Sequence, residues 1–149
     1  MTVKDLIGSR ADVYSIPHDT TVHDAARFLR ERHVRSIGVL DGARLVGVVS
    51  QSDISDKVAA ENKCPAWMRV SEIMSTDLVT VTPDQSLPDC LRLMEQHGIY
   101  HLLVVDTPAA NGTYKGMLSV TDLLSVIASD EKARADMLEA FLFERTTSL

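Results

Sequence analysis

The chain contains one short pattern twice, as Gly47-Val-Val-Ser-Gln-Ser-Asp53 and as Gly116-Met-Leu-Ser-Val-Thr-Asp122. In each version a glycine and two apolar residues precede a serine, and a hydroxyl residue followed by aspartate ends the pattern. Apolar residues match by chance easily, but glycine and polar residues do not. The recurrence therefore predicts an internal repeat.

The repeat extends upstream of this pattern. Residues of the same type fall in step at the paired positions Asp19 and Asp84, Asp24 and Asp89, Arg27 and Arg92, and Asp41 and Asp106. The second copy has a longer loop before its glycine, where Pro108, Asn111 and Gly112 mark a surface connection. Each copy therefore has the same elements in the same order.

That order is β-α-β-β-α, read from apolar spacing and turn residues. Thr21 and Ser86 are expected N-caps of the first helices, Gly98 is the expected end of the second of them, and Asp41-Gly42 is a hairpin turn. The expected strands cover 13–16, 37–40 and 45–49 in the first copy and 78–81, 102–105 and 115–118 in the second, and the closing helices begin near Ser52 and Thr121.

A unit of about 50 residues buries too little surface to be stable alone, so the two copies should pack together. The expected fold class is α/β (α+β), with two β-α-β-β-α repeats packed sheet to sheet in pseudo-two-fold symmetry. The expected boundaries are 1–62 for repeat 1, 63–69 for a linker, 70–128 for repeat 2 and 129–149 for a helical tail.

Two further helical features are expected. Val3–Ile7 and Val70–Met74 share one apolar pattern and are predicted to open the first and second copies respectively. The tail carries an apolar stripe that must pack on its own domain, a second subunit or a partner. The stripe consists of Ala133, Met137, Leu138, Phe141 and Leu142.

Composition excludes several classes of protein. The 149 residues are 45% hydrophobic and 24% charged, with a net charge of -6, which is typical of a globular protein and unfavourable for binding nucleic acid. No stretch approaches the roughly 20 apolar residues of a membrane span, and no signal peptide is evident. Cys64 and Cys90 form no metal-binding or redox pattern and are expected to be free thiols. We expect a cytoplasmic protein that binds neither nucleic acid nor membrane.

The sequence also lacks the residue patterns that are typical of catalytic sites. The histidines form no metal-ligand set, no Gly-rich phosphate loop of the P-loop or dinucleotide type occurs, and no serine or cysteine has a recognisable base. The expectation is a protein that is not an enzyme and has no catalytic cofactor.

The repeated pattern has a chemistry of its own. Ser50, Ser52 and Asp53 fall where a strand runs into a helix, and exposed N–H groups at a helix start attract anions. A carboxylate can accept two hydrogen bonds from the hydroxyls of a ribose. Such a turn can hold sugar and phosphate together, although the same residues can simply cap the helix.

The residues resemble CBS domains, of which two in tandem form a Bateman module. The resemblance rests on Val70-x-x-Ile73-Met74, on Val81-Thr82-Pro83, on the strand Leu102–Asp106, and above all on the doubled pattern, and it runs from about Val3 to Ile127. The chain is similar to the stand-alone bacterial members. The resemblance implies a regulatory module that binds an adenine nucleotide (AMP, ADP, ATP or NAD) in a cleft between the repeats and signals by conformational change.

In this family the aspartate takes ribose, the hydroxyl residues approach phosphate, and the ends of the first strands hold adenine. Carried to this chain, the ligand-binding residues are Ile16, Pro17, Arg35, Ser36, Ser50, Ser52, Asp53, Val81, Thr82, Tyr100, His101, Ser119, Thr121 and Asp122. The chain departs from the family where Gly38 and Leu103 replace a common proline and Ser36 a common histidine. Simpler alternatives are a surface role for Arg35, a backbone-bonded His101 and plain edge strands.

The resemblance also implies partners. Family pairs commonly form flat dimers, so a homodimer is expected, together with an effector protein that the sequence does not identify. The alternative function is an adaptor for dimerisation or partner binding whose clefts are unoccupied.

Overall fold

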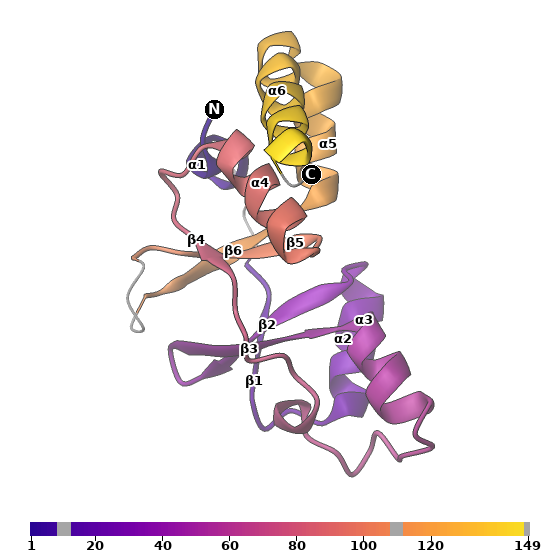
Figure 1. The fold of residues 1–149 in the computed structure, drawn as a ribbon. Helices are drawn as coiled ribbons and strands as arrows, with labels where there is room; N and C mark the ends of the chain where they lie inside the picture. The colour runs from indigo at the N-terminus through magenta and orange to yellow at the C-terminus, as the bar shows by residue number, and fades with distance from the viewer. Residues whose placement is uncertain (9–12, 108–111, 148–149) are drawn as a thin grey trace. The chain divides into compact units, whose positions relative to one another are not determined.

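The computed structural model describes residues 1–8, 13–107 and 112–147, with the side chains of residue 141 and of 143–147 outside that description (Figure 1). The strands are β1 (Ser15–Pro17), β2 (Ser36–Asp41), β3 (Arg44–Ser50), β4 (Thr80–Val81), β5 (His101–Val105) and β6 (Tyr114–Ser119). The helices are α1 (Val3–Ile7), α2 (Val22–Arg32), α3 (Gln51–Ile54), α4 (Leu87–His97), α5 (Val120–Ser129) and α6 (Glu131–Thr147), with a π-helix η1 (Ser55–Ala59) and a 3₁₀ helix η2 (Val70–Glu72).

In the described residues the strands form two three-stranded sheets, ordered β1-β2-β3 and β4-β5-β6. In the first sheet β1 runs parallel to β2, and β2 runs antiparallel to β3. In the second, β4 runs parallel to β5. The mixed α/β class and the β-α-β-β-α order of both repeats are confirmed.

The turn residues act as expected. Asp41 pairs with Arg44 across a tight hairpin in which Gly42 adopts a φ of 62°, a conformation that favours glycine. The backbone N–H of Asp24 donates to Thr21 Oγ1 (3.1 Å), and that of Asp89 donates to Ser86 Oγ (3.2 Å). These bonds confirm the two N-caps. Gly98 ends α4 in the left-handed conformation.

The chain folds into two compact units that exchange their opening segments. The first-repeat unit comprises Val13–Leu78 with Ala109–Tyr114, and the second-repeat unit comprises Met1–Asp12, Val79–Pro108 and Lys115–Leu149. The N–H of Val3 in α1 donates to the Gln85 carbonyl (2.9 Å). Val3–Ile7 thus opens the first copy along the sequence, but in the folded chain this helix completes the second-repeat unit.

The segment that contains η2 makes the matching exchange. The N–H of Val70 donates to the carbonyl of Thr20 (2.8 Å), and Val70 and Ile73 are buried in the core of the first-repeat unit. Val70 and Ile73 therefore stabilise the first repeat, although they stand at the sequence position where the second one opens.

Each unit has its own apolar core. In the first-repeat unit, Leu29 from α2 packs with Ile37 and Val39 from β2. In the second-repeat unit, Leu87 and Met94 from α4 pack with Leu102 from β5. The helices and strands expected from apolar spacing supply these residues, so the sheet and helices of each repeat cover one another's apolar faces.

The tail forms α6, as expected, and packs against α4 and α5. Its buried face consists of Ala133, Met137 and Ala140. Two other members of the expected stripe, Leu138 and Leu142, are 51% and 61% exposed. Leu138 directly follows Met137 and therefore points about 100° around the helix axis from it, so the stripe packs on its own unit only in part. The Phe141 side chain lies outside the described residues.

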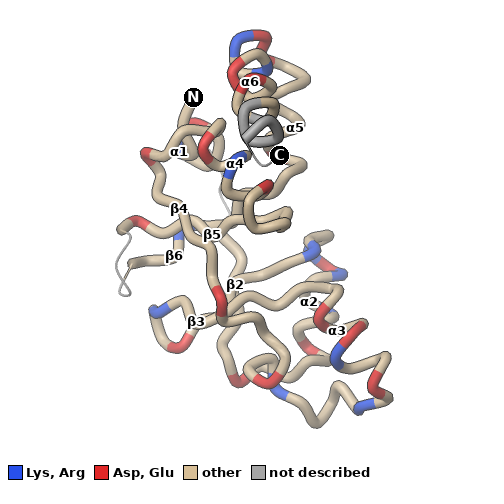
Figure 2. Tube along the Cα trace, in the orientation of Figure 1, with Lys and Arg blue, Asp and Glu red and all other residues tan. Residues whose placement is uncertain are grey.

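Acidic and basic residues are interspersed along the chain. Figure 2 shows Lys and Arg interspersed with Asp and Glu along α6 and around α3. On α2, Arg27 pairs with Glu31 (3.5 Å), and Arg32 lies over the rings of Tyr14 and Phe28. None of the described helices has the length and hydropathy needed to cross a bilayer.

Candidate functional site

In the first repeat, the strand β3 ends at a hydrogen-bonded turn that starts α3. The N–H of Asp53 donates to Ser50 Oγ (3.2 Å), while Asp53 Oδ2 accepts the Ser50 N–H (2.9 Å) and the Ser50 hydroxyl (3.0 Å). Ser52 Oγ lies 2.9 Å from Ser50 Oγ. A hydroxyl has one proton, and the hydroxyl proton of Ser50 is donated to Asp53. The hydroxyl of Ser52 is therefore the donor in its contact with Ser50. The turn is therefore a closed network of two hydroxyls and one carboxylate.

The second repeat builds the same turn where β6 leads into α5. The N–H of Asp122 donates to Ser119 Oγ (3.2 Å), and Asp122 Oδ2 accepts the N–H (2.8 Å) and hydroxyl (3.0 Å) of Ser119. Both turns are capping boxes, with Ser50 and Ser119 as the caps. The capping alternative thus holds for both aspartates, and capping through Oδ2 is compatible with a second role.

A strand start lies beside each turn. The Gln51 N–H donates to the Arg35 carbonyl (3.0 Å), and Ser36 pairs with Ser50 across the sheet. In the second repeat the Val120 N–H donates to the Tyr100 carbonyl (2.9 Å). The structure therefore brings the expected residues 35 and 36 to the first turn, and residue 100, the neighbour of residue 101, to the second.

These side chains differ in their exposure. Arg35, Ser52 and Thr121 are exposed, and Tyr100 is 68% exposed. The remaining members of the two groups are partly buried, namely Ser36, Ser50, Asp53, His101, Ser119 and Asp122. Each unit therefore presents a carboxylate flanked by hydroxyls, with one large exposed side chain beside it.

Within each unit, the ends of β1 and β4 lie apart from the turns. Ile16 pairs with Val39 and Pro17 with Leu40, whereas Ser36 at the start of β2 pairs with Ser50. Three to four residues along a strand correspond to about 10 to 13 Å. In the second repeat, Val81 pairs with Val104, three residues beyond the start of β5.

The side chains of Ile16 and Val81 are only 5% and 1% exposed and belong to the two cores. They can offer a ligand backbone groups only. Pro17 has no N–H, and its carbonyl accepts the N–H of Thr20 (3.1 Å). The Thr82 hydroxyl donates to the Asp84 carboxylate.

The structure explains why position 38 has glycine, where related domains commonly have proline. A Cβ at this position would lie 2.8 Å from Cζ of Tyr114, because the Tyr114 ring packs on the Gly38 backbone. A proline or any other side chain would displace that ring. Sequence reasoning did not connect these two residues, since they are far apart along the chain.

Sequence reasoning also missed Lys57. Its Nζ lies 3.0 Å from Asp53 Oδ1 and donates to the Ile73 carbonyl (2.7 Å). The signal that could have found the ion pair is the spacing of Asp53 and Lys57, because residues four apart on a helix are neighbours.

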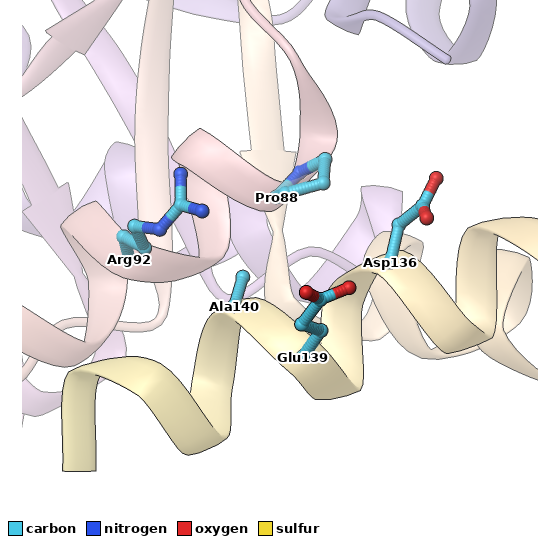
Figure 3. Close-up of a pocket in the computed structure, with 5 residues that line it drawn as sticks. All are labelled: Pro88, Arg92, Asp136, Glu139 and Ala140. Atoms are coloured by element: carbon cyan, nitrogen blue, oxygen red, sulfur yellow. The ribbon is translucent and has the colours of Figure 1, made fainter. Parts of the chain in front are cut away.

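Two surface hollows are lined by residues that are not among the predicted ligand-binding residues. Figure 3 shows one in the second-repeat unit, which is lined by Pro88 and Arg92 on α4 and by Asp136, Glu139 and Ala140 on α6. Its volume is about 390 Å³. Another, of about 370 Å³, lies in the first-repeat unit beside Lys57 and Ile73. Ligand pockets are mostly apolar with a few polar groups, and both hollows are instead rich in charged residues.

The remaining side chains with chemistry of their own are the metal-ligating types and the cysteines. Among the described residues no three His, Cys, Asp or Glu side chains are grouped closely enough to hold a metal ion. Burial in the core raises the pKa of Cys90 to about 12, so its thiol is neutral and unreactive near pH 7.

The CBS domain family model matches residues 3–60 and 70–129. The CBS domain-containing protein YhcV of Bacillus subtilis strain 168 is 31% identical over 132 residues, which are 89% of each chain. The uncharacterized protein MJ1232 of Methanocaldococcus jannaschii is 28% identical over 117 residues, which are 78% of this chain but only 37% of that protein.

Solved structures agree with these matches. A CBS-domain protein of Burkholderia ambifaria MC40-6 is 30% identical with a TM-score of 0.78, over 87% of this chain and 96% of that one. The CBS domain pair of MJ0100, in complex with 5′-methylthioadenosine and S-adenosyl-L-methionine, has a TM-score of 0.74 at 21% identity, over 86% of this chain and 96% of that one. The doubled turn, the two matching units and these likenesses lead to one conclusion: the chain belongs to the CBS-domain family and contains two CBS domains in tandem.

Proposed function

We propose that this chain is a regulatory module that binds an adenine nucleotide and passes the signal to an effector protein by conformational change. The candidate ligands are AMP, ADP, ATP and NAD. The module acts by binding, without catalysis and without a catalytic cofactor.

The observation that carries this proposal is the equivalence of the two turns. In each unit the capping-box aspartate and its serine are joined by the same hydrogen bonds, a second hydroxyl residue directly precedes the aspartate, and a strand start is bonded to the turn through Gln51 N–H to Arg35 or Val120 N–H to Tyr100. A simple helix cap requires neither the second hydroxyl nor the neighbouring strand start. A ribose phosphate can use all of them, since the carboxylate accepts from the sugar while hydroxyl and N–H groups donate to phosphate.

The ligands of the MJ0100 pair support the same chemical class. Both 5′-methylthioadenosine and S-adenosyl-L-methionine consist of an adenosine modified at its 5′ position. The ribose hydroxyls are therefore available in these ligands, as they are in AMP, ADP, ATP and NAD. The group we expect this chain to recognise is the adenosine part, and the 5′ substituent then selects among ligands.

The proposal is tested by thermal unfolding with and without millimolar AMP, ADP, ATP and NAD. A ligand that binds only the folded protein raises its stability, by about 2.7 kcal/mol when present at 100 times its Kd. Asp53→Asn and Asp122→Asn are measured in parallel. Asparagine keeps one acceptor oxygen for the serine cap but loses the charge and the second acceptor that a ribose needs.

The matched control is Asp24→Asn. Asp24 occupies the same position after its cap, Thr21, as Asp53 and Asp122 occupy after theirs, but on α2. A nucleotide shift that Asp24→Asn preserves and one of the other variants removes is the expected result. A cooperative unfolding transition that none of the four nucleotides moves would contradict the proposal.

Exposed leucines favour a second candidate function, that of an adaptor. Leu124 on α5 is 55% exposed, and Leu138 and Leu142 on α6 are 51% and 61% exposed. Apolar groups left in water favour association, and a homodimer is the commonest assembly of such chains. Light scattering on the wild type and on Leu138→Gln tests this: a dimer that the variant dissociates, together with no nucleotide shift, would identify an adaptor.

A further inference from the structure

A lysine connects the turn of the first repeat to the η2 segment, residues 68–75. Lys57 Nζ lies 3.0 Å from Asp53 Oδ1 and donates to the Ile73 carbonyl oxygen (2.7 Å). Asp53 is one of the residues we expect to bind a ligand, whereas Ile73 packs in the core of the first-repeat unit. One ammonium group therefore contacts both the candidate site and the exchanged segment.

The bond to Ile73 attaches the η2 segment on its helix side. Ile73 is the C-cap of η2, and carbonyl groups at a helix end need partners outside the helix. Lys57 on η1 supplies such a partner. On its strand side the same segment is attached through Ser75, whose N–H donates to the Val48 carbonyl (2.8 Å). The segment is thus tied to η1 by a side chain and to β3 by its backbone.

The bond to Asp53 lies where a ribose would have to bind. An ionised carboxylate offers about four acceptor positions. The Ser50 N–H and hydroxyl take two of them on Oδ2, and Lys57 takes one on Oδ1. A ribose diol donates two hydrogen bonds, but only about one position remains. The Asp53 side chain is also only 12% exposed, so the sugar and the lysine compete for Oδ1.

The lysine has other partners available when it leaves Asp53. It lines the hollow of about 370 Å³ in the first-repeat unit, together with the acidic residues Asp56, Glu61 and Glu72. The Lys57 side chain is 46% exposed, and ion pairs that reach solvent contribute little stability. A ligand can therefore displace Lys57 at a small cost in free energy.

We propose that Lys57 couples the turn of the first repeat to the η2 segment: an adenosine ligand that binds Asp53 displaces the lysine, and the segment loses its attachment to η1 and opens more often. This inference rests on the proposed function and names the structural change that binding produces. The coupling is reciprocal, because the attached segment and the ligand use the same lysine in opposite ways.

The test is amide hydrogen exchange, followed by NMR on the wild type with and without saturating adenosine. Adenosine has no phosphate, so it cannot hold Lys57 through an anion. The reporters are the N–H groups of Val48 and Ser75, which bond each other's carbonyls and exchange when the segment opens. We expect adenosine to speed their exchange about three- to tenfold, the effect of about one lost hydrogen bond to a charged group.

An internal control lies in the same unit. The Val34 N–H donates to the Leu29 carbonyl (3.1 Å) at the end of α2, away from the η2 segment. Ligand binding by itself stabilises the folded protein, so exchange at Val34 should stay the same or become slower. Faster exchange at Ser75 without faster exchange at Val34 therefore reports release of the segment and not a general loss of stability.

Two variants identify the lysine responsible. Lys57→Met keeps a similar side-chain length but removes the ammonium, so Val48 and Ser75 should exchange fast without ligand and adenosine should add no further increase. Lys63→Met removes an exposed lysine from the same hollow and changes the net charge equally. This second variant should behave as the wild type does.

Isothermal titration of the wild type with adenosine and AMP measures binding separately. If adenosine binds but exchange at Val48 and Ser75 is unchanged or slower, the inference is overturned and the proposed function stands. An increase in exchange that persists in Lys57→Met also overturns the inference, since the lysine is then not the coupling group. If neither adenosine nor AMP binds, the proposed function fails and this inference fails with it.

Discussion

Val48 and Ser75 exchange two backbone hydrogen bonds: the Val48 N–H donates to the Ser75 carbonyl (3.0 Å), and the Ser75 N–H donates to the Val48 carbonyl (2.8 Å). This pair attaches the segment after η2 to the edge of β3. It lies directly beside Gly47, the first residue of the repeated pattern. The glycine therefore has a packing role that is separate from any ligand.

Gly47→Ala should destabilise the first-repeat unit by about 1 to 3 kcal/mol. An added Cβ would contact the Met74 sulfur, lie 2.8 Å from Met74 Cγ and lie 3.1 Å from the Ser75 carbonyl oxygen. Urea unfolding measures the loss. Adding Met74→Ala should recover part of it, because the two substitutions share one contact. Full stability of Gly47→Ala would show that the exchanged segment is not packed as described.

Ser86→Ala should lower the free energy of unfolding by about 0.5 to 2 kcal/mol. The Ser86 hydroxyl accepts the Asp89 N–H at the start of α4, and alanine leaves this donor without its cap. Ser86→Asn, which can accept the same bond, is the control and should keep most of the stability. Equal losses in both variants would assign the effect to the backbone bridge between Ser86 and Thr2.

Met137→Ala should cost about 2 to 5 kcal/mol, whereas Leu138→Ala should cost less than about 1 kcal/mol. Met137 is 1% exposed, on the face of α6 that packs against the neighbouring helices, and Leu138 is 51% exposed. Chemical unfolding of the two variants compares adjacent residues of similar size. If Leu138→Ala lost more stability than Met137→Ala, the buried face of α6 would contain Leu138 and not Met137.

One cysteine per chain should react with a thiol reagent at pH 8 in the native protein, and two after unfolding. Cys64 is exposed, while burial raises the pKa of Cys90 to about 12, so Cys90 carries almost no thiolate below pH 10. Cys64→Ser should abolish the native reaction. Fast native labelling of Cys64→Ser would mean that the core around α4 opens readily.

The sequence was sufficient for the elements of each repeat because their signals are local. Thr21, Ser86 and Gly98 act on the backbone within one turn, and the Asp41-Gly42 pair sets its own hairpin. The doubling of these signals predicted two matching units. The repeat also identified the two aspartates and the two strand starts, and in each unit the structure brings the aspartate and the strand start together.

The exchange of opening segments could not be predicted in the same way. Val3–Ile7 and Val70–Met74 carry nearly the same apolar pattern, so the pattern does not indicate which repeat each segment packs on. The choice depends on tertiary packing such as the contact of Gly47 with Met74. The hydrogen bond from Lys57 to the Ile73 carbonyl likewise depends on the placement of Ile73, which no local pattern encodes.

Because α1 and the η2 segment are exchanged, the boundaries of the sequence repeats differ from the boundaries of the folded units. Each compact unit takes its opening segment from the other sequence repeat. A cut between residues 62 and 63 would therefore yield two pieces that each lack a buried part and carry an unpaired one. The tandem pair, and not the single repeat, is the smallest complete unit of this fold.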